Sequence, residues 1–317
     1  MSKPRGVRPS NCLLICVNYS AFPIAFLFLG ALATGTGSTN YLRMQVLLDR
    51  AHFSPGEIDG TGGDNFRRAL RAFQSAHGLA ETGNPDAKTL RALEKGMESV
   101  KTLASYTIAE PDVRGPFLPV STDLMEQAKL PKLGYQSPLE GLGEKFHCSP
   151  QLLRRLNPRK DFTKAGSELQ VPNVNQDVPA RAASLEVSKS KQTVLVLDAA
   201  GKIVAEYPAT LGSVHDPLPL GKWKVTGVSH NPIFFYDPKL FWNASESDTQ
   251  AKIQPGPNNP AGTVWIGLSI PHYGIHGTPE PGTVGHTQSH GCIRLTNWDA
   301  MELAKIVKAG TPAVLKE

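Results

Sequence analysis

Residues 289–295 of this 317-residue chain read Ser-His-Gly-Cys-Ile-Arg-Leu, and residues 273–278 shortly before them read Tyr-Gly-Ile-His-Gly-Thr. The two stretches hold Cys292, His276 and His290. A cysteine is a nucleophile only as the thiolate, so either its pKa must fall from about 8.5 or a neighbouring base must take its proton. The pattern therefore indicates a cysteine nucleophile with a histidine base.

Two further residues of the motif suit acyl transfer. Gly291, directly before Cys292, permits a tight turn that can aim amide N–H groups at a developing oxyanion. Arg294 supplies a positive charge for a substrate carboxylate. Each residue type also has an ordinary explanation, because cysteines pack in cores, most histidines are structural, and two histidines with one cysteine are a weak match to a zinc site. The combination favours catalysis over any of these.

The segment around the motif is predicted to be mainly β. Residues 193–197 form a short apolar run, residues 198–201 have turn chemistry, and residues 221–225 and 263–270 are further strands. A long helical pattern appears only at 298–309, where Asn297 is the predicted N-terminal cap.

Residues 184–316 resemble the catalytic domain of the L,D-transpeptidase (YkuD) family. The signature of that family is a His-Gly pair, a spacer, and then Ser/Thr-His-Gly-Cys followed by an apolar residue and Arg. This chain has all of these elements, with twelve residues between His276 and Ser289. The resemblance implies a β-sandwich-like catalytic domain that needs no metal and no organic cofactor.

The resemblance also implies the chemistry. Cys292 would attack the bond between the third and fourth residues of a tetrapeptide stem of peptidoglycan, so that D-alanine leaves and a thioester forms. His276 would be the base, oriented by the backbone carbonyl of Gly277. The Gly291 and Cys292 amides would stabilise the oxyanion, with His290 supporting the turn.

The remaining site residues and the partners are expectations of the same kind. Ser289 would help to support the turn, and Ser289, Arg294 and Tyr273 are the predicted substrate-binding residues. The amine that resolves the thioester would belong to another stem or to a lysine of a wall-anchored lipoprotein. Carbapenems would acylate the same cysteine.

Residues 41–95 are predicted to be a small helical domain, because apolar residues recur there at helical spacing. The domain resembles the three-helix peptidoglycan-binding domain at residues 55–60, Pro-Gly-Glu-Ile-Asp-Gly, and at residues 69–74, Ala-Leu-Arg-Ala-Phe-Gln. A helical spacer without a binding function is the alternative.

Residues 96–134 lack periodicity and are predicted to be a linker. Residues 135–175 resemble a LysM module, a βααβ sugar-binding unit, although residues 136–138, Gln-Ser-Pro, replace the usual Gly-Asp-Thr start. The predicted fold class is therefore a multidomain α+β protein. We expect the two N-terminal modules to localise the enzyme without taking part in its chemistry.

Residues 1–33 are predicted to be an export signal, with a basic start, an apolar stretch and the small residues Ala31 and Ala33; a retained membrane anchor is the alternative. We expect an exported protein of the periplasm or cell envelope, associated with the membrane only transiently through this segment. Outside it the cysteines are Cys148 and Cys292, so no disulfide framework is expected. The net charge of +5 without long runs of like charge does not suggest a nucleic-acid partner.

Two other functions remain open from the sequence. Water as the acceptor would make the protein an L,D-carboxypeptidase or another hydrolase. A degenerate catalytic domain would leave a non-catalytic wall-binding protein, which the intact Cys292, His276 and His290 argue against.

Overall fold

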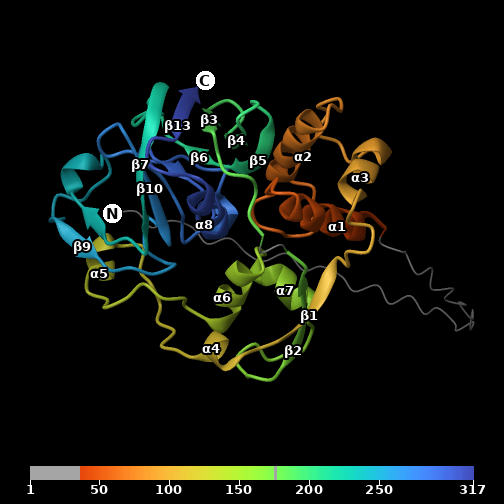
Figure 1. Ribbon diagram of the computed structural model, residues 1–317. Coiled ribbons are helices and arrows are strands. Elements are labelled where there is room, and N and C mark those ends of the chain that lie inside the picture. The colour runs from red at the N-terminus through yellow and green to blue at the C-terminus, as the bar shows by residue number, and fades with distance from the viewer. Residues whose placement is uncertain (1–35, 175–176) are drawn as a thin grey trace, which may run out of the picture. The chain divides into compact units, whose positions relative to one another are not determined.

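The structure is a computed structural model that describes residues 36–174 and 177–317 (Figure 1). The predicted export signal lies outside these residues. Within them, no helix is both long and apolar enough to cross a membrane. Three parts follow one another along the chain: a helical module, a small α+β module and a large sheet.

The first module consists of three helices, as predicted. They are α1 (Thr36–Arg50), α2 (Asp64–Ala76) and α3 (Ala87–Glu94). The periodic residues Phe66, Leu70 and Phe73 of α2 are all buried, because their spacing places them on one face of the helix. They form a core with residues of α1 and α3.

The second module begins earlier than the sequence predicts. Its strand β1 (Leu103–Thr107) pairs antiparallel with β2 (Glu168–Pro172). The helices between them are α4 (Glu110–Val113), α5 (Leu124–Gln127), α6 (Pro138–Lys145) and α7 (Pro150–Leu156). The segment 96–134 is therefore not only a linker, since it holds β1, α4 and α5. Relationship to the LysM family stays a prediction.

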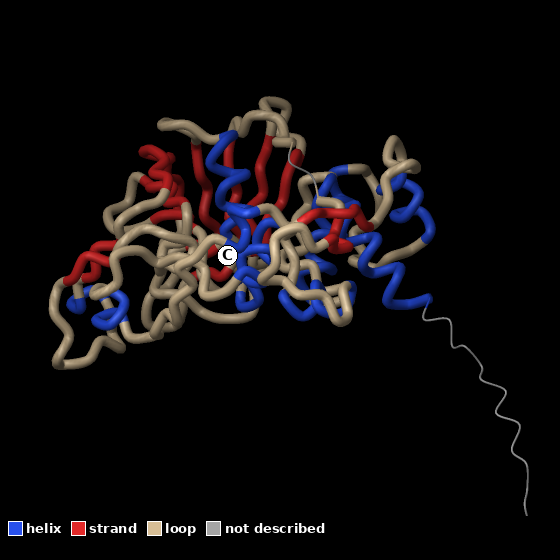
Figure 2. The backbone as a smooth tube through the Cα atoms, turned by 90° about the horizontal axis from the view of Figure 1, so that it is seen from below, coloured by secondary structure: helices blue, strands red, loops and turns tan. Residues whose placement is uncertain are grey.

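A nine-stranded sheet dominates the third part, in the order β5-β4-β3-β13-β7-β10-β11-β12-β6. Its strands are β3 (Ser184–Ser188), β4 (Thr193–Leu197), β5 (Ile203–Pro208), β6 (Thr210–Leu211), β7 (Gly221–His230), β10 (Val264–Leu268), β11 (Gly274–His276), β12 (Ile293–Arg294) and β13 (Pro312–Lys316). Smaller elements are β8 (Phe234–Tyr236), β9 (Ala251–Ile253), η1 (Pro238–Leu240) and η2 (Pro281–Thr283). Figure 2 shows the strands and the loops around them.

The strand β7 joins the two halves of the sheet. Its residues 221–224 pair with β13, and its residues from 225 onwards pair with β10. The expected β-sandwich-like domain is thus one continuous sheet whose halves share a strand. Both halves contribute apolar side chains to a single core, which helix α8 (Asn297–Ile306) completes.

The start of α8 differs from the prediction. The N-cap is Thr296, whose hydroxyl accepts from the backbone N–H of Asp299 at 3.1 Å, and Asn297 is the first helical residue. The Asn297 amide instead makes tertiary contacts with Thr263 and Glu144. A side chain held by such contacts is not available to cap its own helix.

The loop after α1 connects all three parts through backbone pairing. The N–H of Ser54 donates to the carbonyl of Glu206, and the N–H of Glu206 donates to the carbonyl of His52, both at 2.9 Å. This pairing attaches the loop to β5. The same loop pairs with the second module, where Ile58 forms a bridge with Cys148.

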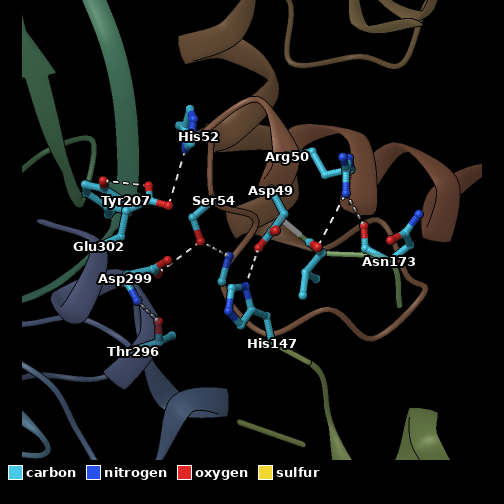
Figure 3. Close-up of polar contacts among 12 residues, drawn as sticks. Asp49, Arg50, His52, Ser54, His147, Asn173, Tyr207, Thr296, Asp299 and Glu302 are labelled. Atoms are coloured by element: carbon cyan, nitrogen blue, oxygen red, sulfur yellow. Dashed lines mark hydrogen bonds and ion pairs between the residues drawn. The ribbon is translucent and has the colours of Figure 1, made fainter. Parts of the chain in front are cut away.

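Side chains reinforce this junction (Figure 3). The Ser54 hydroxyl donates to Asp299 at 3.0 Å, and His147 pairs with Asp49 at 2.7 Å. The His147 ring also stacks on Trp298, with 5.3 Å between ring centroids. Burial at the junction raises the pKa of Asp299 from 3.8 to about 7.

This shift predicts a pH-dependent effect of Asp299→Asn on stability. Because the folded-state pKa is raised, the wild-type protein loses stability as pH rises from 3.8 to about 7. Asn cannot ionise, so we expect the variant to gain free energy of unfolding relative to wild type across this window, by at most about 1.4 kcal/mol per pKa unit. Urea unfolding of both proteins near pH 4 and near pH 8 measures the difference. A difference independent of pH would contradict the buried, protonated Asp299.

Candidate active site

Adjacent parallel strands bring the two motifs together. Ile275 of β11 pairs with Ile293 of β12, and His276 pairs with Arg294. Both isoleucines are buried in the core. Because side chains alternate along a strand, His276 and Arg294 lie on the face of the sheet opposite to these isoleucines. Cys292, which directly precedes Ile293, lies on the same face as His276 and Arg294. The predicted base, nucleophile and cation therefore lie on one face of the sheet.

The hydrogen bond of His276 fixes its tautomer. Its Nδ1 lies 2.7 Å from the carbonyl oxygen of Gly277. A carbonyl only accepts, so Nδ1 carries the hydrogen and Nε2 is left with its lone pair. Burial, together with the positive charge of Arg294, lowers the pKa of His276 to about 3. The ring is thus a neutral base at physiological pH.

The turn that carries Cys292 is held from both sides. Gly291 has φ +91°, and a Cβ there would lie 2.6 Å from the Tyr273 ring, so both the backbone angle and the space favour glycine. The Ser289 hydroxyl donates to the Cys292 carbonyl at 2.6 Å, and the Ser289 N–H donates to the Gly212 carbonyl at 3.0 Å. These contacts support the turn, and direct contact of Ser289 with substrate stays a prediction.

Cys292 is a protonated thiol in this arrangement. Partial burial of the side chain raises its pKa, which a backbone hydrogen bond from Gly274 and the charge of Arg294 counteract only in part. The Sγ atom lies 3.6 Å from the His272 carbonyl oxygen. For a neutral thiol on the same sheet face as a neutral imidazole, we expect activation by proton transfer at the moment of attack.

Arg294 and Tyr273 also belong to this site. The Arg294 guanidinium is half-buried, and its charge interacts with those of Cys292 and Glu280 without a hydrogen bond to a side chain among residues 36–174 and 177–317. Its charge is therefore available to an anionic ligand. Burial raises the pKa of the Tyr273 phenol, and the charge that Cys292 can carry raises it further. Tyr273 thus has a neutral hydroxyl near the nucleophile.

His290 points into a neighbouring loop. Its Nε2 lies 2.9 Å from Oδ1 of Asn243, and its ring lies against Phe241 and Trp242, with centroid distances of 5.0 and 5.9 Å. Burial and the charge of Arg294 lower its pKa. The scaffold role of His290 stays a prediction, which these contacts suit.

Sequence reasoning missed four residues of the site: Asp216, Phe241, Trp242 and Asn243. The negative charge of Asp216 raises the pKa of Cys292 and of Tyr273, which places the carboxylate near both. Trp242, which is 59% exposed, stacks on His215 at 4.4 Å and so connects two loops beside His290. An aromatic pair in a polar loop, Phe241-Trp242, was the available signal.

The structure also bears on Cys148 and on the possibility of a zinc site. Cys148 is buried in the core of the second module, and burial raises the pKa of its thiol. In the part of the chain that the structure describes, no group of three or more His, Cys, Asp or Glu side chains is arranged to hold a metal ion.

Comparison with known proteins shows the family to which the chain belongs. The family model described as the L,D-transpeptidase catalytic domain matches residues 182–315, and the model described as "Putative peptidoglycan binding domain" matches residues 38–93. The "Putative L,D-transpeptidase YkuD" of Bacillus licheniformis is 31% identical over 177 residues, which cover 55% of this chain and 90% of that protein. The chain belongs to the L,D-transpeptidase family.

Other relatives share less sequence with this chain. The protein of the same name from Bacillus subtilis is 29% identical over 174 residues, with 55% of this chain and 90% of that protein covered. The solved structure of L,D-transpeptidase 3 from Mycobacterium tuberculosis is 18% identical, with a TM-score of 0.36 over 48% of this chain and 75% of that chain. That likeness is too low for a comparison of site geometry.

The charge of Arg294 predicts how Arg294→Gln changes the site. The guanidinium lowers the pKa of both the Cys292 thiol and the His276 imidazole. Its removal should therefore raise both pKa values and move alkylation of Cys292 by iodoacetamide to higher pH. Peptide mass spectrometry at Cys292 across a pH series measures this shift. Arg294→Lys keeps the charge and serves as the control; equal profiles for Arg294→Gln and wild type would contradict the electrostatic role.

Proposed function

We propose that this protein is a peptidoglycan L,D-transpeptidase that acts through a thioester on Cys292. The observation that carries the proposal is the neutral His276 imidazole, whose Nδ1 is bonded to Gly277 while its Nε2 remains a base on the face of the sheet that also holds Cys292. The matched catalytic and peptidoglycan-binding families support an enzyme that acts on peptidoglycan.

The acylation step uses groups of this site. The Cys292 sulfur attacks the carbonyl carbon of the bond between residues three and four of a tetrapeptide stem, while its proton passes to Nε2 of His276. The oxyanion is stabilised by the amides of Gly291 and Cys292. The imidazolium then gives its proton to the departing D-alanine amine as the C–N bond breaks. The product is a thioester on a neutral enzyme.

The second half of the reaction sets the outcome. An amine of another stem attacks the thioester, His276 takes its proton, and the restored thiol leaves as a new amide forms. A lysine of a wall-anchored lipoprotein is chemically equivalent to the stem amine. Water as the acceptor would give a tripeptide, the product of an L,D-carboxypeptidase.

The location follows from the substrate. Peptidoglycan lies outside the cytoplasmic membrane, so this proposal includes export to the periplasm or cell envelope, with residues 1–33 as the signal. The module at 38–93 would bind the wall and hold the enzyme at its substrate.

Three variants separate the roles of the site residues. Cys292→Ala should form no acyl adduct with a carbapenem at any pH. His276→Ala should lose about 10²- to 10⁴-fold in acylation rate near neutral pH, as expected for a missing general base. Its rate should partly recover as pH rises, because hydroxide can then deprotonate the thiol. His290→Ala should lose rate without this recovery, because it removes support and not a base.

Intact mass spectrometry of the carbapenem adduct measures these rates. The matched control is His286→Ala, which removes an exposed histidine from the same loop region and should behave as wild type. If the acylation rate of His290→Ala recovered at high pH and that of His276→Ala did not, His290 would be the base and His276 the supporting residue.

The reaction itself is tested with disaccharide-tetrapeptide and the pure full-length protein. A cross-linked dimer with release of D-alanine is the expected product. Formation of tripeptide alone would show that the protein hydrolyses the thioester and is not a transpeptidase. An unchanged substrate would favour a non-catalytic wall-binding protein and overturn the proposal.

A further inference from the structure

The Gly277 peptide that orients His276 is tightly enclosed. A Cβ on Gly277 would lie 2.1 Å from Oδ1 of Asn297, and a Cβ on Gly262 would lie 2.7 Å from the Gly277 Cα. On the other side, the Gly277 N–H donates to the Val264 carbonyl at 3.2 Å. The position of the Asn297 side chain therefore bears directly on where the Gly277 carbonyl lies.

The Asn297 amide is itself fixed by three hydrogen bonds. Its Oδ1 accepts from the N–H of Thr263 at 3.0 Å, and its Nδ2 donates to the Pro257 carbonyl at 3.1 Å and to Oε1 of Glu144 at 2.8 Å. Thr263 and Pro257 belong to the same catalytic domain as Asn297. Glu144 comes from α6 of the second module and makes the shortest of the three bonds.

Glu144 is built into this position and is not a solvated surface charge. Its other oxygen, Oε2, accepts from the Tyr135 hydroxyl at 3.3 Å. Burial is the largest effect on the carboxyl group and raises its pKa to about 7, and the charge of Glu140 also raises it. The hydrogen bonds from Asn297 and Tyr135 and the charge of His147 lower the pKa. A carboxyl group in such a site is commonly held there by its hydrogen bonds.

We propose that Glu144 is a positioning residue for the catalytic base, acting from the second module through Asn297 and Gly277 on His276. The module at 103–172 then does more than localise the enzyme, because it completes the support of the active site. This inference rests on the proposed function for the role of His276.

Glu140 provides a control that distinguishes positioning of His276 from simple attachment of the second module to the catalytic domain. Glu140 lies one turn earlier on α6, and its Oε1 accepts from Nδ2 of Asn258 at 2.7 Å. Asn258 also donates to the Gly134 carbonyl at 2.9 Å. Glu140 therefore fastens the same helix to the same domain without a bond to Asn297, so Glu140→Ala is a matched control.

The test compares variants of the full-length protein. We expect Glu144→Ala to lower kcat on disaccharide-tetrapeptide by about 10-fold with little change in KM, because a misplaced base affects the chemical step more than binding. Glu144→Gln retains an acceptor oxygen for Asn297 and should restore most of kcat. Glu140→Ala should keep the wild-type kcat.

Alkylation of Cys292 by iodoacetamide gives a readout that needs no peptidoglycan substrate. Near neutral pH, Glu144→Ala should slow alkylation in the same direction as His276→Ala, whereas Glu140→Ala should not. If Glu144→Ala does not fold, Glu144→Asp keeps the carboxyl group, shortens its reach to Asn297 and makes the same test.

The outcomes distinguish the two proposals. Equal losses of kcat for Glu144→Ala and Glu140→Ala would reduce Glu144 to a docking contact and overturn this inference. Wild-type kcat and alkylation in folded Glu144→Ala and Glu144→Asp would overturn it as well. A wild-type protein that fails to convert tetrapeptide, but whose alkylation still depends on Glu144 and not on Glu140, would overturn the proposed function and leave the positioning role standing.

Discussion

The hydrogen bond from Nδ1 of His276 to the Gly277 carbonyl is the constraint on which the site depends. It determines which ring nitrogen is protonated and leaves Nε2 as the base. Burial keeps the ring neutral, and burial likewise keeps the Cys292 thiol protonated. Both groups are therefore neutral at physiological pH before substrate binds.

The surrounding structure serves to keep that bond in place. The parallel pairing of β11 and β12 brings together two motifs that lie apart in the sequence, and apolar side chains on the other face anchor both strands in the core. The Gly277 peptide has little room to move, because Asn297 and Gly262 pack directly against it. Rigid support of this kind is what allows a base to stay aligned with its nucleophile.

The N-terminal modules are joined to the catalytic domain more intimately than separate wall-binding units would require. The loop from His52 to Ile58 pairs by its backbone with both other parts, and the segment that resembles the peptidoglycan-binding motif is largely buried there. Burial at this junction raises the pKa of Asp299 to about 7.

The sequence predicts most where the signal is local. Cys292, His276 and Gly277 lie in short motifs, and the three-helix module follows from helical spacing of Phe66 and Phe73. It was insufficient where a residue acts through distant partners. Strand β1 pairs with a strand more than sixty positions later in the chain. Asn297 was predicted to cap a helix, because nothing in the neighbouring sequence indicates its contacts with Thr263 and Glu144.

The most direct test of this account is the protonation state of His276 itself. Nitrogen-15 NMR of the labelled imidazole, followed across a pH series and assigned with His276→Ala, reports both the charge and the tautomer of the ring. The account predicts a neutral ring with the hydrogen on Nδ1 throughout the neutral range, with protonation only toward a pKa of about 3. An imidazolium at neutral pH, or a neutral ring with the hydrogen on Nε2, would contradict it.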